Sequence, residues 1–152
     1  MSRQMVTMEQ YDKIYLYRRI VKAKLFIDER FTEAIDLNNI ADQAHFSKFH
    51  FIRLFKSIYG LTPKGYLISK RINAAKKHLV EGFTVTETCL MVGWESPTSF
   101  AGMFKKMTGR TPSNFQHGEN ERRKAIENLP LKFVPNCYAE SHGWTNSNFE
   151  EV

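Results

Sequence analysis

Apolar residues recur at helical spacing along most of this chain. Spacings of three and four residues place side chains on one face of an α-helix. One such run extends from about Glu9 to Phe31 and includes Ile14, Tyr17, Val21, Leu25 and Ile27. Another extends from about Pro63 to Val80 and includes Tyr66, Leu67, Ile68, Ile72, Ala75 and Leu79. No convincing alternation of a β-strand occurs before residue 117, so the pattern predicts an all-α fold.

The chain also repeats itself at a fixed offset of 49 residues. Phe51, Phe55, Gly60, Thr62 and Pro63 fall on Phe100, Phe104, Gly109, Thr111 and Pro112. Matches in one constant frame indicate two copies of a single structural unit.

Each copy has the pattern of helix, turn and helix. In the first copy, Asp36 is a suitable N-cap for a short helix with Leu37, Ile40, Ala41 and Ala44 on one face. His45 and Phe46 form the expected turn. Ser47 then caps a helix of about residues 47–58, and Gly60 ends it in a left-handed conformation. The predicted buried stripe of that helix is Phe51, Leu54, Phe55 and Ile58.

The second copy follows the same order. Thr84 or Thr86 begins the short helix, Cys89 and Val92 face inward, and Gly93 makes the turn. Ser96 and Pro97 are typical of a helix start, and they open a helix of about residues 96–107 that Gly109 ends. The long helix at 63–80 joins the two copies, which predicts a compact seven-helix domain over residues 9–116.

Residues 117–152 form an extension of unknown role. The helix before it is expected to run to about Asn128, and the remainder is irregular and aromatic, with Phe133, Tyr138, Trp144 and Phe149. These aromatic side chains either pack back on the domain or bind a partner protein.

The distribution of charge favours a polyanionic partner. The net charge is +6, with about +8 in residues 1–116 and −2 in residues 117–152. Between Asp42 and Glu81 no acid occurs, whereas eight bases do: Lys48, Arg53, Lys56, Lys64, Lys70, Arg71, Lys76 and Lys77. Basic side chains that neutralise phosphates release counterions, which drives binding to nucleic acid.

Several classes of protein do not fit. The five histidines and two cysteines have no metal-ligand spacing, and no nucleophile motif, Walker loop or dinucleotide-binding glycine pattern occurs. We therefore expect no enzyme, metal or cofactor. The absence of a long apolar stretch and of a signal core predicts a cytoplasmic protein with reduced thiols.

At these motifs the chain resembles the AraC/XylS family of bacterial transcription regulators, over about residues 12–116. The resemblance is strongest at Gly93-Trp94-Glu95-Ser96-Pro97, Phe100, Phe104-Lys105-Lys106, Gly109 and Thr111-Pro112. The first copy adds Ile40-Ala41, Ser47, Phe51, Arg53, Phe55-Lys56, Gly60 and Thr62-Pro63, and the joining helix adds Arg71 and Ala75. The resemblance implies two recognition helices, at about 47–58 and 96–107, in successive major grooves of DNA.

The family's base-facing positions fall on Phe49, Ile52 and Arg53 in the first helix, and on Thr98, Ser99, Ala101 and Gly102 in the second. We expect further contacts to DNA from Ser47, Lys48, His50, Lys56, Ser96, Lys105 and Lys106. Arg53 is suited to pair with guanine through two hydrogen bonds. Its alternative role is an ion pair with a neighbouring acid, and the alternative for Phe49 is partial burial. Family members commonly have a polar residue where this chain has Gly102, and an Ile-Ala pair where it has Thr88-Cys89.

The sequence thus predicts sequence-specific binding of double-stranded DNA by a monomer, with RNA polymerase as a candidate protein partner. The alternative is an interaction module whose C-terminal tail binds another protein. Only about ten residues precede the first expected helix, so we expect a small stand-alone regulator, while a fragment of a longer regulator stays open.

Overall fold

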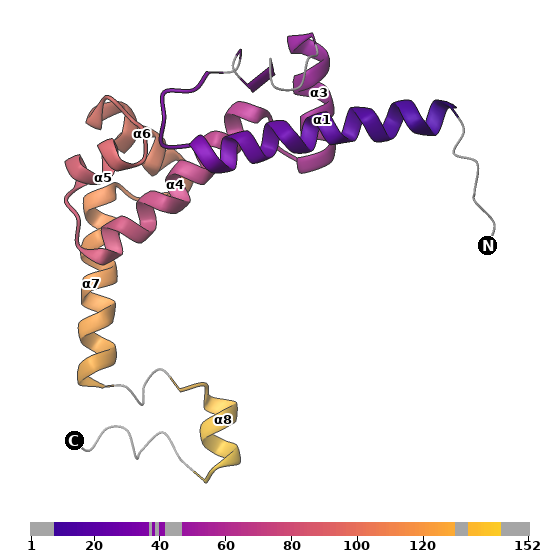
Figure 1. Cartoon of the computed structure of the whole chain (residues 1–152). Coiled ribbons are helices and arrows are strands. Elements are labelled where there is room, and N and C mark those ends of the chain that lie inside the picture. The colour runs from indigo at the N-terminus through magenta and orange to yellow at the C-terminus, as the bar shows by residue number, and fades with distance from the viewer. Residues whose placement is uncertain (1–7, 37, 39, 42–46, 130–133, 144–152) are drawn as a thin grey trace.

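The computed structural model describes residues 8–36, 38, 40–41, 47–129 and 134–143, and these are helical for the most part (Figure 1). Six helices precede the tail: α1 Met8–Arg30, α3 Lys48–Tyr59, α4 Pro63–Glu81, α5 Val85–Met91, α6 Pro97–Thr108 and α7 Pro112–Asn128. The described residues include no strand, which confirms the all-α class.

The expected count of seven helices is not supported, because the described part of the domain contains six with assigned bounds. The short helix expected at 37–44 lies largely outside the described residues, as does the turn at His45-Phe46. Of its described positions, Ile40 and Ala41 are buried, and the Ile40 amide donates to the Asp36 carbonyl at 3.2 Å.

Two separate clusters of buried side chains form the core, and α4 contributes to both. The first cluster joins Ile20, Ala23 and Ile27 of α1 to Phe51 and Phe55 of α3 and Leu67 of α4. The second joins Ile72, Ala75 and Leu79 of α4 to Cys89, Val92, Phe100 and Phe104. The long helix therefore joins the two copies, as the sequence predicts, by packing into both cores.

The repeat in the sequence is also a repeat in the packing. The rings of Phe51 and Phe55 lie 5.7 Å apart between centroids, and those of Phe100 and Phe104 lie 5.8 Å apart. Tyr66 meets Phe55 edge-on at 5.8 Å, and Phe115, which is 49 residues later, meets Phe104 in the same way at 5.5 Å. Edge-to-face pairs of this kind are favourable beyond their buried area.

The helix boundaries follow the predicted caps with one exception. Ser96 Oγ accepts from the Ser99 amide at 3.3 Å, and Thr62, which is not among the predicted caps, accepts from the Gly65 amide through Oγ1 at 3.1 Å. Gly60, Gly93 and Gly109 have φ of 74°, 81° and 79°, as a left-handed turn residue requires. Ser47 occupies the N-cap position of α3, but its side chain makes no capping hydrogen bond.

The start of α5 is also resolved. Thr84 caps this helix, and Thr86 lies inside it. The Thr84 amide donates to Glu87 Oε2 at 2.8 Å while the Glu87 amide donates to Thr84 Oγ1 at 3.2 Å. This reciprocal arrangement is a capping box, which satisfies two amides that the helix leaves without partners.

The buried faces of α3 and α1 differ from the apolar positions that stand out in the sequence. Ile58 is 39% exposed, so the buried face of α3 consists of Phe51 and Phe55 with Leu54 beside them. In α1 the residues that first indicated the helix are largely outside the core: Ile14, Tyr17, Val21 and Leu25 are 45–49% exposed. The core side of α1 is Ile20, Ala23 and Ile27.

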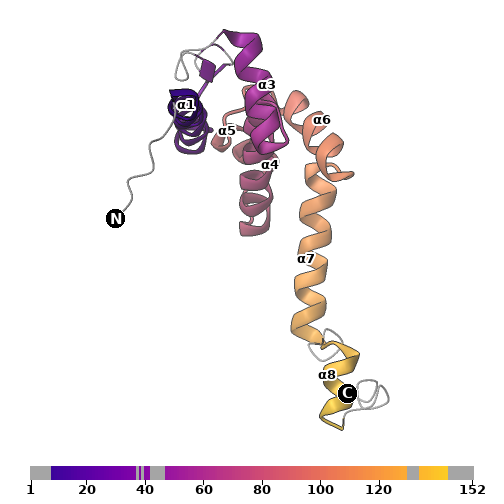
Figure 2. The same ribbon diagram turned by 90° about the vertical axis from the view of Figure 1, so that its right-hand side faces the viewer.

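The C-terminal part of the chain extends away from this domain. α7 runs to Asn128 as predicted, and a short helix, α8 Asn136–Ser141, follows at its far end (Figures 1 and 2). Tyr138 is 51% exposed and stacks on His142 at 4.2 Å between ring centroids, so it does not pack back on the domain. Phe133, Trp144 and Phe149 lie outside the described residues.

Candidate nucleic-acid interface

The outer face of α3 carries the first group of predicted contact residues. Phe51 and Phe55 are fully buried on one side of this helix, so residues offset by two positions point the other way. Ser47, Lys48, Phe49, His50, Arg53 and Lys56 are exposed, and Ile52 is half-buried. Phe49 is 79% exposed, so it is not partly buried against the domain. The Phe49 ring is therefore accessible to a partner.

Lys48 and Arg53, two charged residues of this face, differ in the contacts that they make. Lys48 Nζ donates to Asn38 Oδ1 at 3.1 Å, which ties the start of α3 to the segment before it. No acid in the described part of the chain forms an ion pair with Arg53. The guanidinium is therefore not engaged by a described acid and is available to a ligand.

The outer face of α6 carries the second group and offers shorter side chains. Ser96, Thr98, Ser99, Gly102, Lys105 and Lys106 are exposed, and Ala101 is half-buried. A Cβ atom at Gly102 would meet nothing within 4 Å. The helix backbone is thus open at this point, and a partner could approach it more closely than at any longer side chain.

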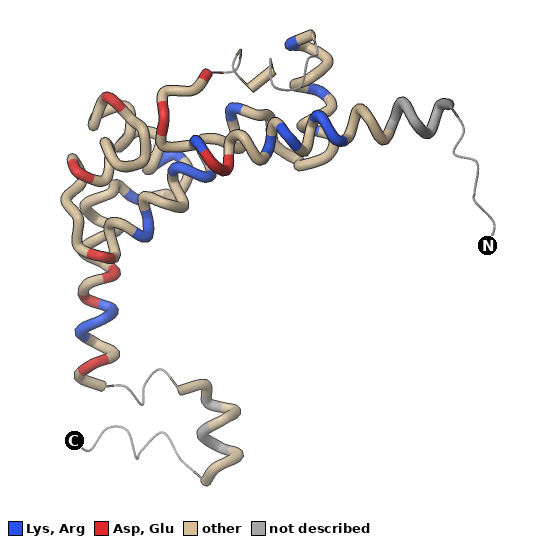
Figure 3. The backbone as a smooth tube through the Cα atoms, viewed as in Figure 1, with Lys and Arg blue, Asp and Glu red and all other residues tan. Residues whose placement is uncertain are grey.

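The two faces belong to units at different ends of α4 (Figure 1). Lys and Arg positions are frequent along α1, α3 and α4 (Figure 3). α6 adds Lys105 and Lys106 in its last turn, where cations also interact favourably with the helix dipole. The predicted residues therefore form two surfaces rather than one continuous site.

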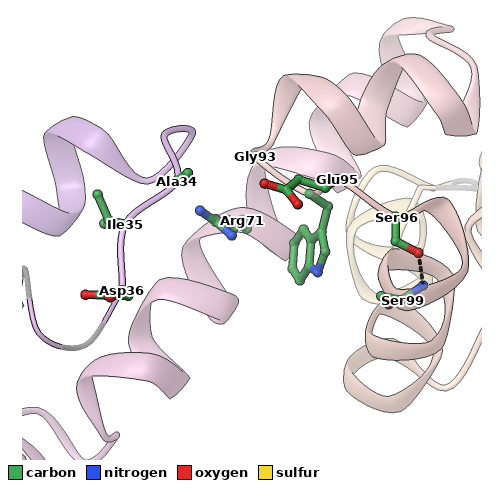
Figure 4. Close-up of a pocket in the computed structure, with 9 residues that line it drawn as sticks. Ala34, Ile35, Asp36, Arg71, Gly93, Glu95, Ser96 and Ser99 are labelled. Atoms are coloured by element: carbon green, nitrogen blue, oxygen red, sulfur yellow. Dashed lines mark hydrogen bonds between the residues drawn. The ribbon is translucent and has the colours of Figure 1, made fainter.

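An open pocket of about 430 Å³ lies where the two units meet (Figure 4). Its walls come from residues 34–36, from Arg71 of α4, and from residues 93–96 with Ser99 of the second unit. In the sequence, Arg71 stands out only as one of eight bases and as a match to the family. Its position between the two units has no signal in local periodicity, because the contacts join segments about 40 residues apart.

The described residues contain no candidate metal centre. Among the residues whose placement the structure describes, no group of three or more His, Cys, Asp and Glu side chains could hold a metal ion. Cys89 is buried, and burial raises the pKa of its thiol. Cys137 is exposed, and both thiols are free. In the described part of the chain, no helix has the length and apolar character needed to cross a membrane.

Comparison with known proteins identifies the family to which this arrangement belongs. A family model described as a helix-turn-helix domain matches residues 40–118. The chain is 34% identical over 85 residues to the probable transcription factor PqrA of Proteus vulgaris, covering 55% of this chain and 70% of PqrA. It is 38% identical over 92 residues to the bifunctional transcriptional activator/DNA repair enzyme AdaA of Bacillus subtilis, covering 60% of this chain. The chain spans only 44% of the length of AdaA.

A solved structure shares the fold. The DNA-binding domain of AdpA, a global transcriptional factor crystallised with a target DNA, matches with a TM-score of 0.64 and 27% identity. That match covers 70% of this chain and 96% of the AdpA domain. The family model and the relatives agree with the resemblance drawn from the repeated motifs. The chain therefore belongs to the helix-turn-helix family and carries a DNA-binding domain of the AraC type.

Proposed function

We propose that this chain regulates transcription by binding double-stranded DNA, with α3 in one major groove and α6 in the next. The observation that carries the proposal is the pair of equivalent helices. Each buries two phenylalanines at the same positions of the repeat and exposes the opposite face. An α-helix fits the major groove of B-DNA, where each base pair presents a distinct pattern of donors and acceptors. The complex of the related AdpA domain with DNA supports this assignment.

We assign each candidate residue a role that suits its chemistry. In α3 we assign base reading to Phe49, Ile52 and Arg53, and phosphate contacts to Lys48, His50 and Lys56 and to the N-cap residue Ser47. In α6 we assign base contacts to Thr98, Ser99, Ala101 and Gly102, and phosphate contacts to Lys105 and Lys106 and to the N-cap residue Ser96. Arginine can form two hydrogen bonds with guanine, and apolar side chains pack on the methyl group of thymine.

We further propose residues 9–116 as the DNA-binding domain, with a seventh helix in the segment around 37–44, and residues 117–152 as an extension. Two reading helices in one chain allow it to bind as a monomer. RNA polymerase is a candidate protein partner, and the cytoplasm is the proposed location. We assign no enzymatic activity to this chain. The repair activity in the name of AdaA belongs to that protein, and we do not propose it here.

The salt dependence of binding tests the proposal. If the basic side chains make about 6–10 phosphate contacts, affinity for a selected duplex should fall by about 10³–10⁵ between 50 mM and 200 mM salt. Fluorescence anisotropy with purified protein measures this slope. An affinity that does not change with salt, or an absolute requirement for a dimer on every selected site, would contradict the proposal.

The tail supports a second, additional function as a binding site for a partner protein. α8 lies at the far end of α7, and its Tyr138 is half-exposed. Removal of residues 130–152 should then leave DNA affinity unchanged and reduce transcriptional output in cells. A large gain in DNA affinity after truncation would show instead that the tail inhibits binding.

A further inference from the structure

Arg71 lies on α4 at the boundary between the two cores and bonds to the first unit. Its Nε donates to the Phe31 carbonyl at 2.6 Å, and its Nη2 donates to the Glu33 carbonyl at 2.6 Å. Both acceptors belong to the loop that follows α1. The planar fork of a guanidinium suits two carbonyls in fixed positions, whereas a lysine ammonium is a single point of charge.

The same guanidinium reaches the second unit. Its Cζ lies 5.5 Å from the centroid of the Trp94 ring, and that ring packs on Phe100 of α6 at 5.4 Å. A cation over an indole ring is attracted by the negative face of the ring. One side chain therefore contacts the loop after α1 and a ring that packs against the core of the second unit. Figure 4 shows Arg71 between that loop and the turn at Gly93.

A backbone contact beside Arg71 joins the units more closely. Gly93 has φ of 81°, and a Cβ atom on it would lie 2.5 Å from the Thr32 carbonyl oxygen and 2.8 Å from the Thr32 carbonyl carbon. The turn between α5 and α6 thus rests directly on the backbone after α1. Any side chain at this position would force the two segments apart.

From these contacts we infer that the junction of Arg71, Gly93 and Thr32 sets the angle between α3 and α6. Through that angle it sets the number of base pairs that must separate the two halves of a DNA site. This inference rests on the proposed function. In the described part of the chain, α4 contributes to both cores, and the junction adds a second contact between the units away from the axis of α4. A second, off-axis contact is what prevents one unit from turning relative to the other.

The geometry of DNA explains why the angle would determine spacing. One helical turn of about 10–10.5 base pairs advances about 34–36 Å, so one inserted base pair moves the second groove by about 3.4 Å and rotates it by about 35°. A rigid pair of units cannot follow this change, but units released from the junction can. The junction would therefore act on specificity for spacing and not on the reading of individual bases.

Two variants disrupt the junction in different ways. Gly93→Ala introduces the clash with the Thr32 carbonyl, and Arg71→Lys keeps the positive charge but removes the two-pronged hydrogen bonding. Gly82→Ala is the matched control, because Gly82 also has a positive φ, of 102°, while its Cβ would meet nothing within 4 Å. Gly82 ends α4 and lies outside both proposed recognition helices.

The experiment measures affinity for a selected full site, for the same site with one base pair added or removed between its halves, and for each half alone. Wild-type protein and Gly82→Ala should lose about tenfold on the altered spacings, an effect like that of one mismatched base pair. Gly93→Ala and Arg71→Lys should lose about tenfold on the selected spacing and discriminate less between spacings. Their affinity for each half-site should stay within about twofold of wild type.

A spacing profile in both variants equal to that of wild type would overturn the inference, as would an equal loss on half-sites and full sites. Residual dipolar couplings supply a readout without DNA. The angle between α3 and α6 should change in Arg71→Lys and Gly93→Ala and not in Gly82→Ala, and an unchanged angle overturns the inference. If Gly93→Ala does not fold, Arg71→Lys decides. If wild-type protein binds no duplex, the proposed function fails, while the couplings still show whether the junction sets the angle.

Discussion

Arg53 and Gly102 show how differently the two proposed recognition helices are equipped. α3 presents an arginine that no described acid engages, beside the exposed ring of Phe49. α6 presents two hydroxyl groups, a half-buried alanine and a glycine without neighbours. Side chains with several fixed donors discriminate bases better than a bare backbone does. The first helix should therefore carry more of the sequence specificity than the second.

Substitution of Arg53 tests this division. Arg53→Ala should cost about 1–3 kcal/mol of binding free energy and relax the preference at one or two base pairs, because a bidentate contact is lost. Thr98→Ala and Ser99→Ala are the matched truncations in α6 and should cost less. Binding titrations followed by random-site selection give both quantities. A greater relaxation of specificity by the α6 variants would reverse the assignment.

Thr88 is the one described residue whose buried side-chain oxygen makes no hydrogen bond. Thr88 is fully buried in α5, where the resemblance predicted an apolar residue. A buried hydroxyl without a partner costs about 1–3 kcal/mol, and valine has the same shape and a similar helix propensity. Thr88→Val should therefore raise the free energy of unfolding by about 1 kcal/mol in urea titrations.

A matched threonine provides the control for this prediction. Thr108 Oγ1 donates to the Phe104 carbonyl at 2.8 Å and accepts from the Arg110 amide at 3.3 Å. Thr108→Val should therefore lower the free energy of unfolding by about 1 kcal/mol, because a made hydrogen bond is removed. Stabilisation by both substitutions would mean that the effect comes from added apolar surface and not from the hydroxyl.

At the scale of elements, α1 and α4 are joined by a carboxylate. Asp28 of α1 accepts from Lys24 of its own helix, from Tyr66 Oη at 2.9 Å and from Lys70 Nζ at 3.0 Å. Burial by itself raises the pKa of Asp28, but the hydrogen bonds from Lys24, Lys70 and Tyr66 outweigh it and lower the pKa below its ordinary value. The carboxylate is thus stabilised in its charged form in the folded protein.

This shift predicts how stability depends on pH. A group whose pKa is lower in the folded state contributes stability above its unfolded pKa of about 3.9, and loses that contribution as the pH falls through the folded pKa. Asp28→Asn should therefore lower the melting temperature at neutral pH, and the gap to wild type should close below about pH 4. Circular dichroism melts across this range measure the gap. Glu29→Gln, an exposed neighbour on α1, should leave melting nearly unchanged. A gap that persists at low pH would mean that the loss is not electrostatic.

Features set by local signals could be predicted from the sequence, whereas features set by tertiary contacts could not. The start of α4 at Thr62-Pro63, its end at Gly82 and the turn at Gly93 follow from backbone preferences of single residues, so they were predictable. The core face of α1 was not. Ile14, Tyr17, Val21 and Leu25 have the spacing of a buried stripe and are about half-exposed, whereas Ala23 is buried. Which of two apolar faces is covered depends on the neighbour of the helix and not on the helix itself.

At the scale of the whole molecule, the repeat predicted two units because each copy carries its own phenylalanines, caps and glycine. The relative orientation of the two copies leaves almost no pattern in the sequence. It depends on Arg71 and two carbonyls far away in the sequence, and on a backbone contact at Gly93. Main-chain acceptors exist at every residue, so sequence alone cannot say which ones a side chain will reach. The candidate residues of each helix were therefore predictable, and the geometry between the helices was not.

That geometry leads to a prediction about the shape of the DNA. α4 has 19 residues, which at about 1.5 Å per residue makes it about 28 Å long. Two helices that read one face of straight B-DNA must lie one turn apart, about 34 Å. Since α4 packs into both cores and Arg71 ties them together, the units cannot spread to match this distance. Both helices can enter their grooves fully only if the duplex curves toward the protein.

Circular-permutation gel mobility on a selected site should therefore show a bend centred between the two half-sites. Smooth bending of a 20–30 base-pair site by 40–90° costs on the order of 1–6 kcal/mol, and the contacts of a second inserted helix can offset a cost of this size. If no bend is found, footprinting on the same site distinguishes two reasons for its absence. An unbent site with one protected turn would mean that α6 stays outside its groove. An unbent site with two protected turns would mean that α4 and the Arg71 junction do not hold the units rigidly, because only units free to move apart can span straight DNA.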